Sequence, residues 1–214
     1  MLTLKTNLAT YFQKPSIQST FLYNQQIWRR ALIVAIPKAE KPLGDPKSYR
    51  PISLLCFSFK ILERLIYARV ETITDPLLPQ KQAGLRHGRW AVDQVTLLTQ
   101  DIEDSFSVKK KAGAVFVDLT AAYDTAWHCG LTYKLLRFLP DRHMVHMIMK
   151  MVSNCSFALT TGNGRRSRLR RLKNGVPQGS VLAPLLFNIY TSDLPATISR
   201  KYAYNDDLAI MHSD

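Results

Sequence analysis

The sequence lacks the usual marks of a secreted or membrane-anchored protein. Its three cysteines are odd in number and form no CxxC pair, which indicates neither a disulfide framework nor a zinc site. No run reaches the length of about 18 apolar residues that would span a membrane. The opening segment, MLTLKTNLATYFQKPS, contains no uninterrupted apolar stretch of signal length. These absences favour a reducing, intracellular setting.

Acidic residues are also scarce. Lys and Arg number 29 against 16 Asp and Glu, which gives a formal net charge of +13. This excess favours an anionic partner, and nucleic acid above all, although a basic ribosomal or merely soluble protein would carry the same charge. With 46% hydrophobic residues and no internal repeat, the chain is expected to form one large domain or two small lobes around a core.

Apolar patterning predicts a mixture of strands and helices. Residues 31–36, ALIVAI, are stopped by Pro37 and predict a buried strand, and residues 113–119, GAVFVDL, predict another. Two amphipathic helices are predicted over residues 53–70 and 92–106. Their apolar positions are Leu54, Leu55, Ile61, Leu62, Leu65 and Ile66, then Val92, Val95, Leu98, Ile102 and Phe106, while Met144, Ile148, Met151 and Val152 predict a further helix.

Two turn motifs follow in the second half of the chain. NGVPQGS, residues 174–180, precedes VLAPLLFNIYTSDL, which predicts a helix with Pro184 in its first turn. YAYNDDLAI, residues 202–210, predicts a tight hairpin with an acidic pair at its tip. Because strands and helices do not alternate as strict βαβ units, the pattern favours an α+β fold over a doubly wound sheet.

Three aspartates are candidates for catalysis. Asp118 ends a predicted buried strand, although an isolated aspartate there is also typical of a turn or a helix N-cap. Asp206 and Asp207 would repel each other unless a cation sits between them, and Mg²⁺ prefers oxygen ligands. Together the three could hold two ions about 3.5–4 Å apart, as in-line phosphoryl transfer requires. Taken alone, Asp-Asp is a weak signal, since many exposed turns contain it.

The combination of motifs is far more specific. FVDLTAAYD, NGVPQGSVLAPLLFNIY and YAYNDDLAI resemble, in order and kind, the central motifs of non-LTR (LINE-type) retrotransposon reverse transcriptases, in particular the jockey and CR1-like elements. Upstream, IPKAEKPLGDPKSYRPISLLCFSFKILERLI and LLPQKQAGLRHGR resemble the fingers segment of that family. The resemblance therefore covers nearly the whole chain from about Trp28 onward.

The resemblance implies an α+β fold with the fingers and palm of a right-hand polymerase, in which an antiparallel palm sheet packs on helices. The implied division is an N-terminal extension at 1–27, a fingers-like segment at 28–110 and a palm at 111–214, with 129–170 partly in the fingers. The sequence ends at Asp214, directly after the acidic hairpin, so the thumb is expected to be absent. On that ground we expect no processive synthesis, and weak or absent polymerase activity, from this polypeptide alone.

The implied activity is RNA-directed DNA polymerisation, in which deoxynucleoside triphosphates are added to a DNA primer on an RNA template. Asp118 and Asp206 would be ligands of two Mg²⁺ ions, with Mn²⁺ as an alternative, and Asp207 would be the second acid of the pair. Tyr123 resembles the aromatic gate that excludes a ribose 2′-hydroxyl, although an ordinary core tyrosine would look the same.

Further residues are implied to bind the nucleotide, primer and template. Gln178 and Gly179 resemble the turn that approaches the incoming nucleotide, with glycine allowing close backbone contact. Arg50 resembles the fingers arginine that grips the triphosphate, with Lys38 assisting. Tyr204 and Asn205 would lie at the primer end. The basic run RRSRLRRLK could neutralise the template or primer, or form a solvated charged hairpin, and its arginines are Arg165, Arg166, Arg168, Arg170 and Arg171.

Some positions depart from the family pattern. Asn205 stands where the family usually has a small or apolar residue, very often alanine, and Trp90 and Ala91 stand where Ser-Thr is common. Such departures keep a second hypothesis open, namely a catalytically inactive remnant that only binds nucleic acid. An RNA-dependent RNA polymerase would use similar paired acids, but Tyr123 and the PQG turn favour the reverse transcriptase. The family would act in the nucleus, although the sequence contains no clear localisation signal.

Overall fold

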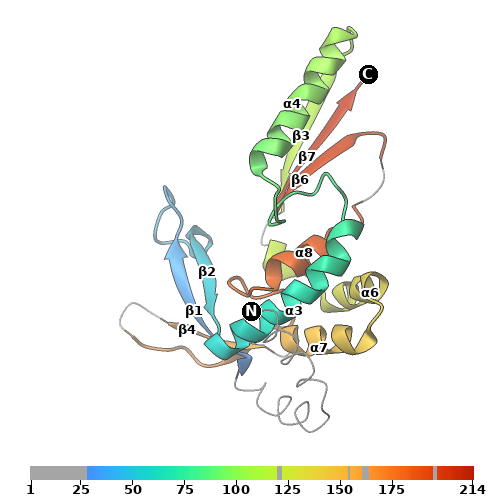
Figure 1. Cartoon of the computed structure of the whole chain (residues 1–214). Helices are drawn as coiled ribbons and strands as arrows, with labels where there is room; N and C mark the ends of the chain where they lie inside the picture. The colour runs from blue at the N-terminus through green and yellow to red at the C-terminus, as the bar shows by residue number, and fades with distance from the viewer. Residues whose placement is uncertain (1–27, 120–121, 154, 161–163, 195–196) are drawn as a thin grey trace.

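The computed structural model describes residues 28–119, 122–153, 155–160, 164–194 and 197–214. The predicted N-terminal extension, residues 1–27, lies outside these residues. Helices form the centre of the molecule, and one small sheet projects from each of two sides (Figure 1).

The first sheet has the strand order β2-β1-β4-β5. Its strands are β1 (Arg30–Pro37), β2 (Tyr49–Leu54), β4 (Ser156–Thr160) and β5 (Arg170–Arg171), and a short 3-10 turn, η1 (Pro46–Ser48), precedes β2. Strand β1 runs antiparallel to β2 and parallel to β4. The strand predicted at 31–36 is confirmed, but its predicted burial is wrong, because only Ala31 of β1 is buried. This sheet projects beside the helices, which leaves most of β1 without a covering layer (Figure 1).

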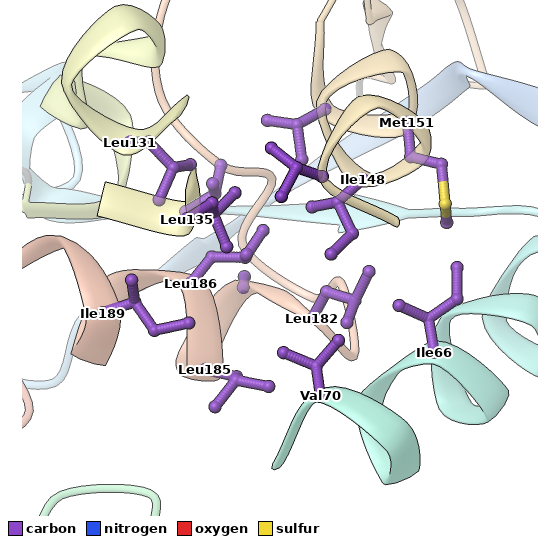
Figure 2. Close-up of a cluster of buried hydrophobic side chains, with 14 of the residues drawn as sticks. Ile66, Val70, Leu131, Leu135, Ile148, Met151, Leu182, Leu185, Leu186 and Ile189 are labelled. Carbon is purple, nitrogen blue, oxygen red and sulfur yellow. The ribbon is translucent and has the colours of Figure 1, made fainter. Parts of the chain in front are cut away.

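The main core lies between four helices. They are α3 (Phe57–Thr74), α6 (His128–Phe138), α7 (Arg142–Val152) and α8 (Ala183–Tyr190), and η2 (Asp75–Leu77) follows α3. Figure 2 shows their apolar side chains converging. Among those that are buried are Ile66 and Val70 of α3, Leu131 and Leu135 of α6, Ile148 and Met151 of α7, and Leu186 and Ile189 of α8.

The helix predicted over 53–70 begins later than expected. Ser53 and Leu54 belong to β2, where they pair with Ile33 and Leu32 of β1, and α3 starts only at Phe57. Apolar spacing alone could not separate a strand end from a helix start in this run. The helix at α7 and the helix with Pro184 in its first turn are both confirmed.

The second sheet has the antiparallel order β3-β7-β6 and packs against α4 (Ala91–Ser107). Its strands are β3 (Ala112–Asp118), β6 (Arg200–Tyr204) and β7 (Asp207–Ser213), and a short helix, α5 (Ala122–Thr125), follows β3. A small apolar cluster of Tyr202, Ala209 and Met211 lies under α4. The burial predicted for the strand that ends at Asp118 is wrong. Strand β3 lies at an edge of the sheet, and Val115 and Phe116 are 62% and 74% exposed.

The mixture of an antiparallel sheet on a helix, a second sheet and a helical core confirms the α+β prediction. The division into fingers and palm stays a prediction, and α4, although it precedes residue 110, packs on the sheet of the second segment. Within the described part of the chain, no helix is both long enough and apolar enough to cross a membrane.

Candidate active site

Tyr123 of α5 connects the three central motifs. Its carbonyl oxygen accepts a hydrogen bond from the Val176 amide at 2.8 Å, which ties the segment after β3 to the NGVPQGS turn. Its hydroxyl donates to Oδ1 of Asn205 in the β6–β7 turn at 2.6 Å. Its ring packs against Phe187 of α8, with the ring centroids 4.9 Å apart. The motifs that the sequence places far apart therefore meet around one half-buried tyrosine.

Burial raises the pKa of Tyr123 to about 12, and the nearby Asp206 carboxylate acts in the same direction. The hydroxyl is therefore a neutral hydrogen-bond donor at physiological pH. It lies close enough to Asp206 to feel its charge, which places the predicted gate beside one of the predicted acids.

The three aspartates lie at one end of the second sheet. Asp118, the last residue of β3, is directly opposite Asp207, the first residue of β7. Residues opposite each other in an antiparallel pair share a face of the sheet, with Cβ atoms about 4.5–5.5 Å apart. Asp206 lies one residue earlier, in the turn, where its carbonyl oxygen accepts from the Leu119 amide at 3.2 Å. The register thus pairs Asp118 with Asp207, whereas the family resemblance implied that Asp118 and Asp206 are the metal ligands.

The donor chemistry of this pair suits a divalent cation. The Asp118 and Asp207 side chains are at least partly open to solvent, and among the described residues neither makes an ion pair or a side-chain hydrogen bond. Two facing carboxylates without a cationic partner offer the oxygen ligands that a hard divalent cation prefers. Over the same residues, however, no group of three or more acidic, histidine or cysteine side chains is close enough to hold an ion. The third carboxylate, that of Asp206, is engaged by Asn205.

The turn of the acidic hairpin is held in an unusual conformation. Asn205 has a φ of 58°, in the left-handed region that asparagine tolerates better than most residues. Its Nδ2 donates to Oδ1 of Asp206 at 2.6 Å. Tyr204, predicted to contact the primer, is half-buried and lies opposite Asp207 across the hairpin.

Residues 82–84, in the loop before α4, pack against the backbone of this turn. Gln82 and Ala203 of β6 form a parallel β-bridge, and the Ala83 amide donates to the Ala203 carbonyl oxygen at 2.9 Å. Gly84 follows, and a Cβ atom at this position would lie 1.9 Å from the backbone nitrogen of Asn205. Only a residue without a side chain permits this approach.

Two buried amides lock that segment onto α8. The Gln82 side chain donates to the Asn188 carbonyl oxygen and Oδ1, both at 3.1 Å, and to the Thr191 hydroxyl at 2.8 Å. Asn188 in turn donates to the Gly84 carbonyl oxygen at 2.9 Å. Both amides are nearly fully buried. These hydrogen bonds therefore replace the ones that the amides would make to water in the unfolded chain.

The PQG turn docks on the end of β2. The Ser53 amide donates to the Gln178 carbonyl oxygen at 2.7 Å. Gly179 has a φ of 106°, and a Cβ atom there would lie 2.7 Å from the Ser53 carbonyl oxygen. The glycine is therefore required by the contact between the turn and the strand, whether or not a nucleotide also approaches it.

Glu63 anchors the residues after that turn. This α3 side chain is 2% exposed, and it accepts hydrogen bonds from the Ser180 hydroxyl and, at 3.1 Å, from the Val181 amide. Burial raises the pKa of Glu63 above its ordinary value, while the two hydrogen bonds act in the opposite direction. The buried carboxylate thus fixes the start of α8 relative to α3.

Gln178 faces a cavity at the base of the first sheet. Its amide makes a long hydrogen bond of 3.4 Å to Asp124, and both residues line a cavity of about 420 Å³ together with Pro51, Ser53 and Phe157. Partial desolvation raises the pKa of the Asp124 carboxyl. Cavities with mainly apolar walls and a few polar groups are the usual form of small-molecule sites.

The predicted triphosphate-binding cations lie together at the end of the β1–β2 hairpin where the connecting loop, residues 38–48, joins the two strands. Arg50 is exposed and pairs with Ile36, and Lys38, directly after β1, donates its amide to the Ser48 carbonyl oxygen at 2.7 Å. Arg50 is three residues from Ser53, roughly 10 Å along the strand from the docked PQG turn.

The five arginines of the basic run are all exposed, and they lie on or next to the outer edge of the first sheet. Arg170 and Arg171 pair with Phe157 and Ser156 of β4, and Arg166 forms an isolated bridge with Thr160. An exposed charged hairpin fits both interpretations that the sequence left open, contact with a template or primer and a solvated surface. Its position at a sheet edge is compatible with contact to a nucleic-acid backbone.

Several positioning residues were not identified from the sequence. Glu63 sits on the apolar stripe of α3, and Asn188 interrupts the apolar run of α8. A buried polar residue on an otherwise apolar face is the signal that could have pointed to both. Gln82 and Gly84 carry no comparable signal, because their role depends on a loop reaching a distant hairpin.

Comparison with known proteins agrees with the motifs. Residues 36–214 match the family described as "Reverse transcriptase (RNA-dependent DNA polymerase)". The chain is 38% identical over 197 residues to the probable RNA-directed DNA polymerase from transposon BS of Drosophila melanogaster, an alignment that covers 87% of the chain and 22% of that protein. It is 34% identical over 175 residues to the RNA-directed DNA polymerase from mobile element jockey of the same species, covering 81% of the chain and 19% of that protein.

The chain thus spans about a fifth of the length of these relatives. A solved structure of telomerase from Candida tropicalis without its C-terminal domain shares the fold, with a TM-score of 0.60 at 14% identity, over 88% of the chain and 44% of that structure. The family match, the relatives and the grouping of the three motifs around Tyr123 lead to one conclusion: the chain belongs to the reverse transcriptase family, and it resembles the members found in non-LTR retrotransposons of the jockey type.

Proposed function

We propose that this chain is the fingers-and-palm part of an RNA-directed DNA polymerase that adds deoxynucleotides to the 3′-hydroxyl of a DNA primer on an RNA template. The observation that carries the proposal is the convergence of the acidic hairpin, the PQG turn and Tyr123. A nuclear site of action, where a genomic end would supply the primer, belongs to the same proposal.

Each group has a task in this reaction. Asp118 and Asp207 face each other at the sheet end and would hold a divalent cation, with Asp206 joining from the turn. When bound, such ions activate the attacking hydroxyl and stabilise the leaving pyrophosphate. Lys38 and Arg50 would hold the triphosphate, because a guanidinium can grip phosphate oxygens in two places.

Tyr123, Gln178 and Gly179 would lie around the sugar and base of the incoming nucleotide. The ring of Tyr123 packs against Phe187 and its hydroxyl donates to Asn205, two contacts that would restrain it from moving away from a 2′-hydroxyl. The exposed arginines from Arg165 to Arg171 would contact the template or primer backbone, where cations supply affinity without reading sequence.

Primer extension on an RNA template tests the proposal. Asp118→Asn, Asp206→Asn and Asp207→Asn are compared with Asp104→Asn, which removes the charge of an exposed aspartate on α4. We expect weak extension to short, Mg²⁺-dependent products with deoxynucleotides by the unmodified chain and by the Asp104 variant, and a loss of at least about a hundredfold in the other three. Equal extension by all four variants would refute the assignment of these acids.

A second candidate function is nucleic-acid binding without catalysis. It is favoured by one observation, namely that Asp206 is bonded to Asn205 and forms no three-acid cluster with other residues that the structure describes. This function would be established if the chain binds nucleic acid in a salt-sensitive way and neither the unmodified chain nor any variant extends a primer in Mg²⁺ or Mn²⁺.

A further inference from the structure

Asn205 contacts two parts of the candidate site at once. Its Oδ1 accepts from the Tyr123 hydroxyl, and its Nδ2 donates to Oδ1 of Asp206, both at 2.6 Å. All three residues are half-buried, where such bonds are better shielded from water than at the surface. An alanine at this position could make neither bond.

The amide can satisfy both partners in only one orientation. A flipped amide would direct its oxygen at the Asp206 carboxylate, where two acceptors repel each other. The backbone adds a second constraint, because the left-handed φ of 58° and the contact with Gly84 fix the place from which the side chain starts. Asn205 is thus held firmly between the tyrosine and the acid.

We propose that Asn205 is a positioning residue that couples the nucleotide gate Tyr123 to the acid Asp206. The inference rests on the proposed function, since it assigns a role within the same site. The amide holds the Tyr123 ring against the turn and so strengthens discrimination against ribonucleotides. It also occupies one oxygen of Asp206, for which a divalent cation must compete, and so it weakens cation binding.

Two variants separate these effects. Asn205→Gly removes the amide while accepting the left-handed backbone, and Tyr123→Phe removes only the hydroxyl that donates to Asn205. The matched control is Gln100→Ala, which removes an exposed amide that is likewise bonded to an aspartate, Asp104, at 2.9 Å. Thermal melting of each variant shows whether the fold is retained.

The first readout is Mn²⁺ binding by the whole chain, followed through the electron paramagnetic resonance signal of the free ion. We expect Asn205→Gly to bind Mn²⁺ at least about tenfold more tightly than the unmodified chain, the change that loss of one competing hydrogen bond to a charged group would give. Tyr123→Phe and Gln100→Ala should bind as the unmodified chain does, because the bond from Asn205 to Asp206 persists in both.

The second readout is the ratio of deoxynucleotide to ribonucleotide incorporation. Asn205→Gly and Tyr123→Phe should each lower this ratio by about fivefold, and the double variant should lower it no further, because both break one bond. Unchanged Mn²⁺ binding and an unchanged ratio in Asn205→Gly would overturn the inference. So would additive effects of the two substitutions on the ratio.

Asp206→Asn distinguishes failure of the inference from failure of the proposed function. If Mn²⁺ binding is unaffected by Asp206→Asn and equally by Asp118→Asn and Asp207→Asn, the proposed metal site itself is wrong. If binding depends on Asp206 but Asn205→Gly behaves as the unmodified chain, the site stands and only the coupling through Asn205 fails.

Discussion

Single residues decide how closely the segments of this site approach one another. Gly84 is the clearest case, because its backbone touches the turn of the acidic hairpin. We expect Gly84→Ala to destabilise the chain by about 1–3 kcal/mol, the usual cost of forcing atoms into a packed position. Primer extension should fall even under conditions in which the variant remains folded, because the added methyl group displaces the residues around Asp206.

Gly44 provides the matched control. It lies in the loop between β1 and β2, and a Cβ atom there would have no neighbour within 4 Å. Gly44→Ala should leave melting temperature and extension nearly unchanged. Equal behaviour of the two alanine variants would show that the loop before α4 does not support the hairpin turn.

Glu63 gives a prediction about pH. Its pKa in the folded chain is raised above the ordinary value of 4.5 by burial. As pH rises above 4.5, the Glu63 carboxyl therefore loses its proton in the unfolded chain before it does so in the folded chain. The free energy of unfolding that this group contributes falls as pH rises through the raised pKa of the folded chain. The stability of the unmodified chain relative to Glu63→Gln should be greatest at or below pH 4.5 and should fall as pH rises.

Thermal melting from acidic to neutral pH measures this trend. Glu103→Gln, at an exposed position of α4, sets the baseline for replacing a surface carboxylate. A constant difference between the unmodified chain and Glu63→Gln across this range would mean that Glu63 is better solvated than its 2% exposure indicates.

At the scale of elements, the core between α3, α6, α7 and α8 holds the site together (Figure 2). Leu135 and Leu136 are neighbours on α6, but the first is fully buried and the second is 47% exposed. We expect Leu135→Ala to cost about 2–5 kcal/mol of unfolding free energy and Leu136→Ala less than about 1 kcal/mol. Chemical denaturation of both variants measures the difference, and similar costs would contradict this packing of α6 in the core.

Helix α8 shows why elements were easier to predict than their contacts. Its apolar run and Pro184 predicted the helix, and the structure confirms it. Nothing in that run indicated that Asn188 would bond to Gln82 and Gly84, more than 100 residues earlier in the chain. A helix follows from local spacing, whereas a buried amide finds its partner only through the tertiary fold.

At the scale of the whole molecule, the charge of +13 predicts salt-dependent binding to nucleic acid. Arg170→Gln with Arg171→Gln should lower the slope of log affinity against log salt concentration by about 0.9 for each duplex phosphate that is no longer neutralised. Lys110→Gln with Lys111→Gln removes the same charge from the segment before β3 and should change the slope little. Filter binding over a range of salt concentrations measures both slopes, and equal reductions would mean that only the net charge matters.

Local patterns in the sequence were enough to predict the kinds of element, the α+β class and the family. These depend on local apolar periodicity, on turn chemistry and on motifs such as YAYNDDLAI, each of which is contained in a short stretch of the chain. The sequence also identified Tyr123 and the three aspartates as candidates. It overstated the burial of β1 and β3, because an apolar run has the same composition whether or not another layer covers it.

Which of these residues contact one another depends on the three-dimensional fold. The register of β3 and β7 sets Asp118 against Asp207, and Asn205 joins Tyr123 to Asp206. Register, buried amides and the approach of Gly84 all arise from contacts between segments distant in the chain. Such contacts are selected by the packing of the whole fold, so no local pattern records them.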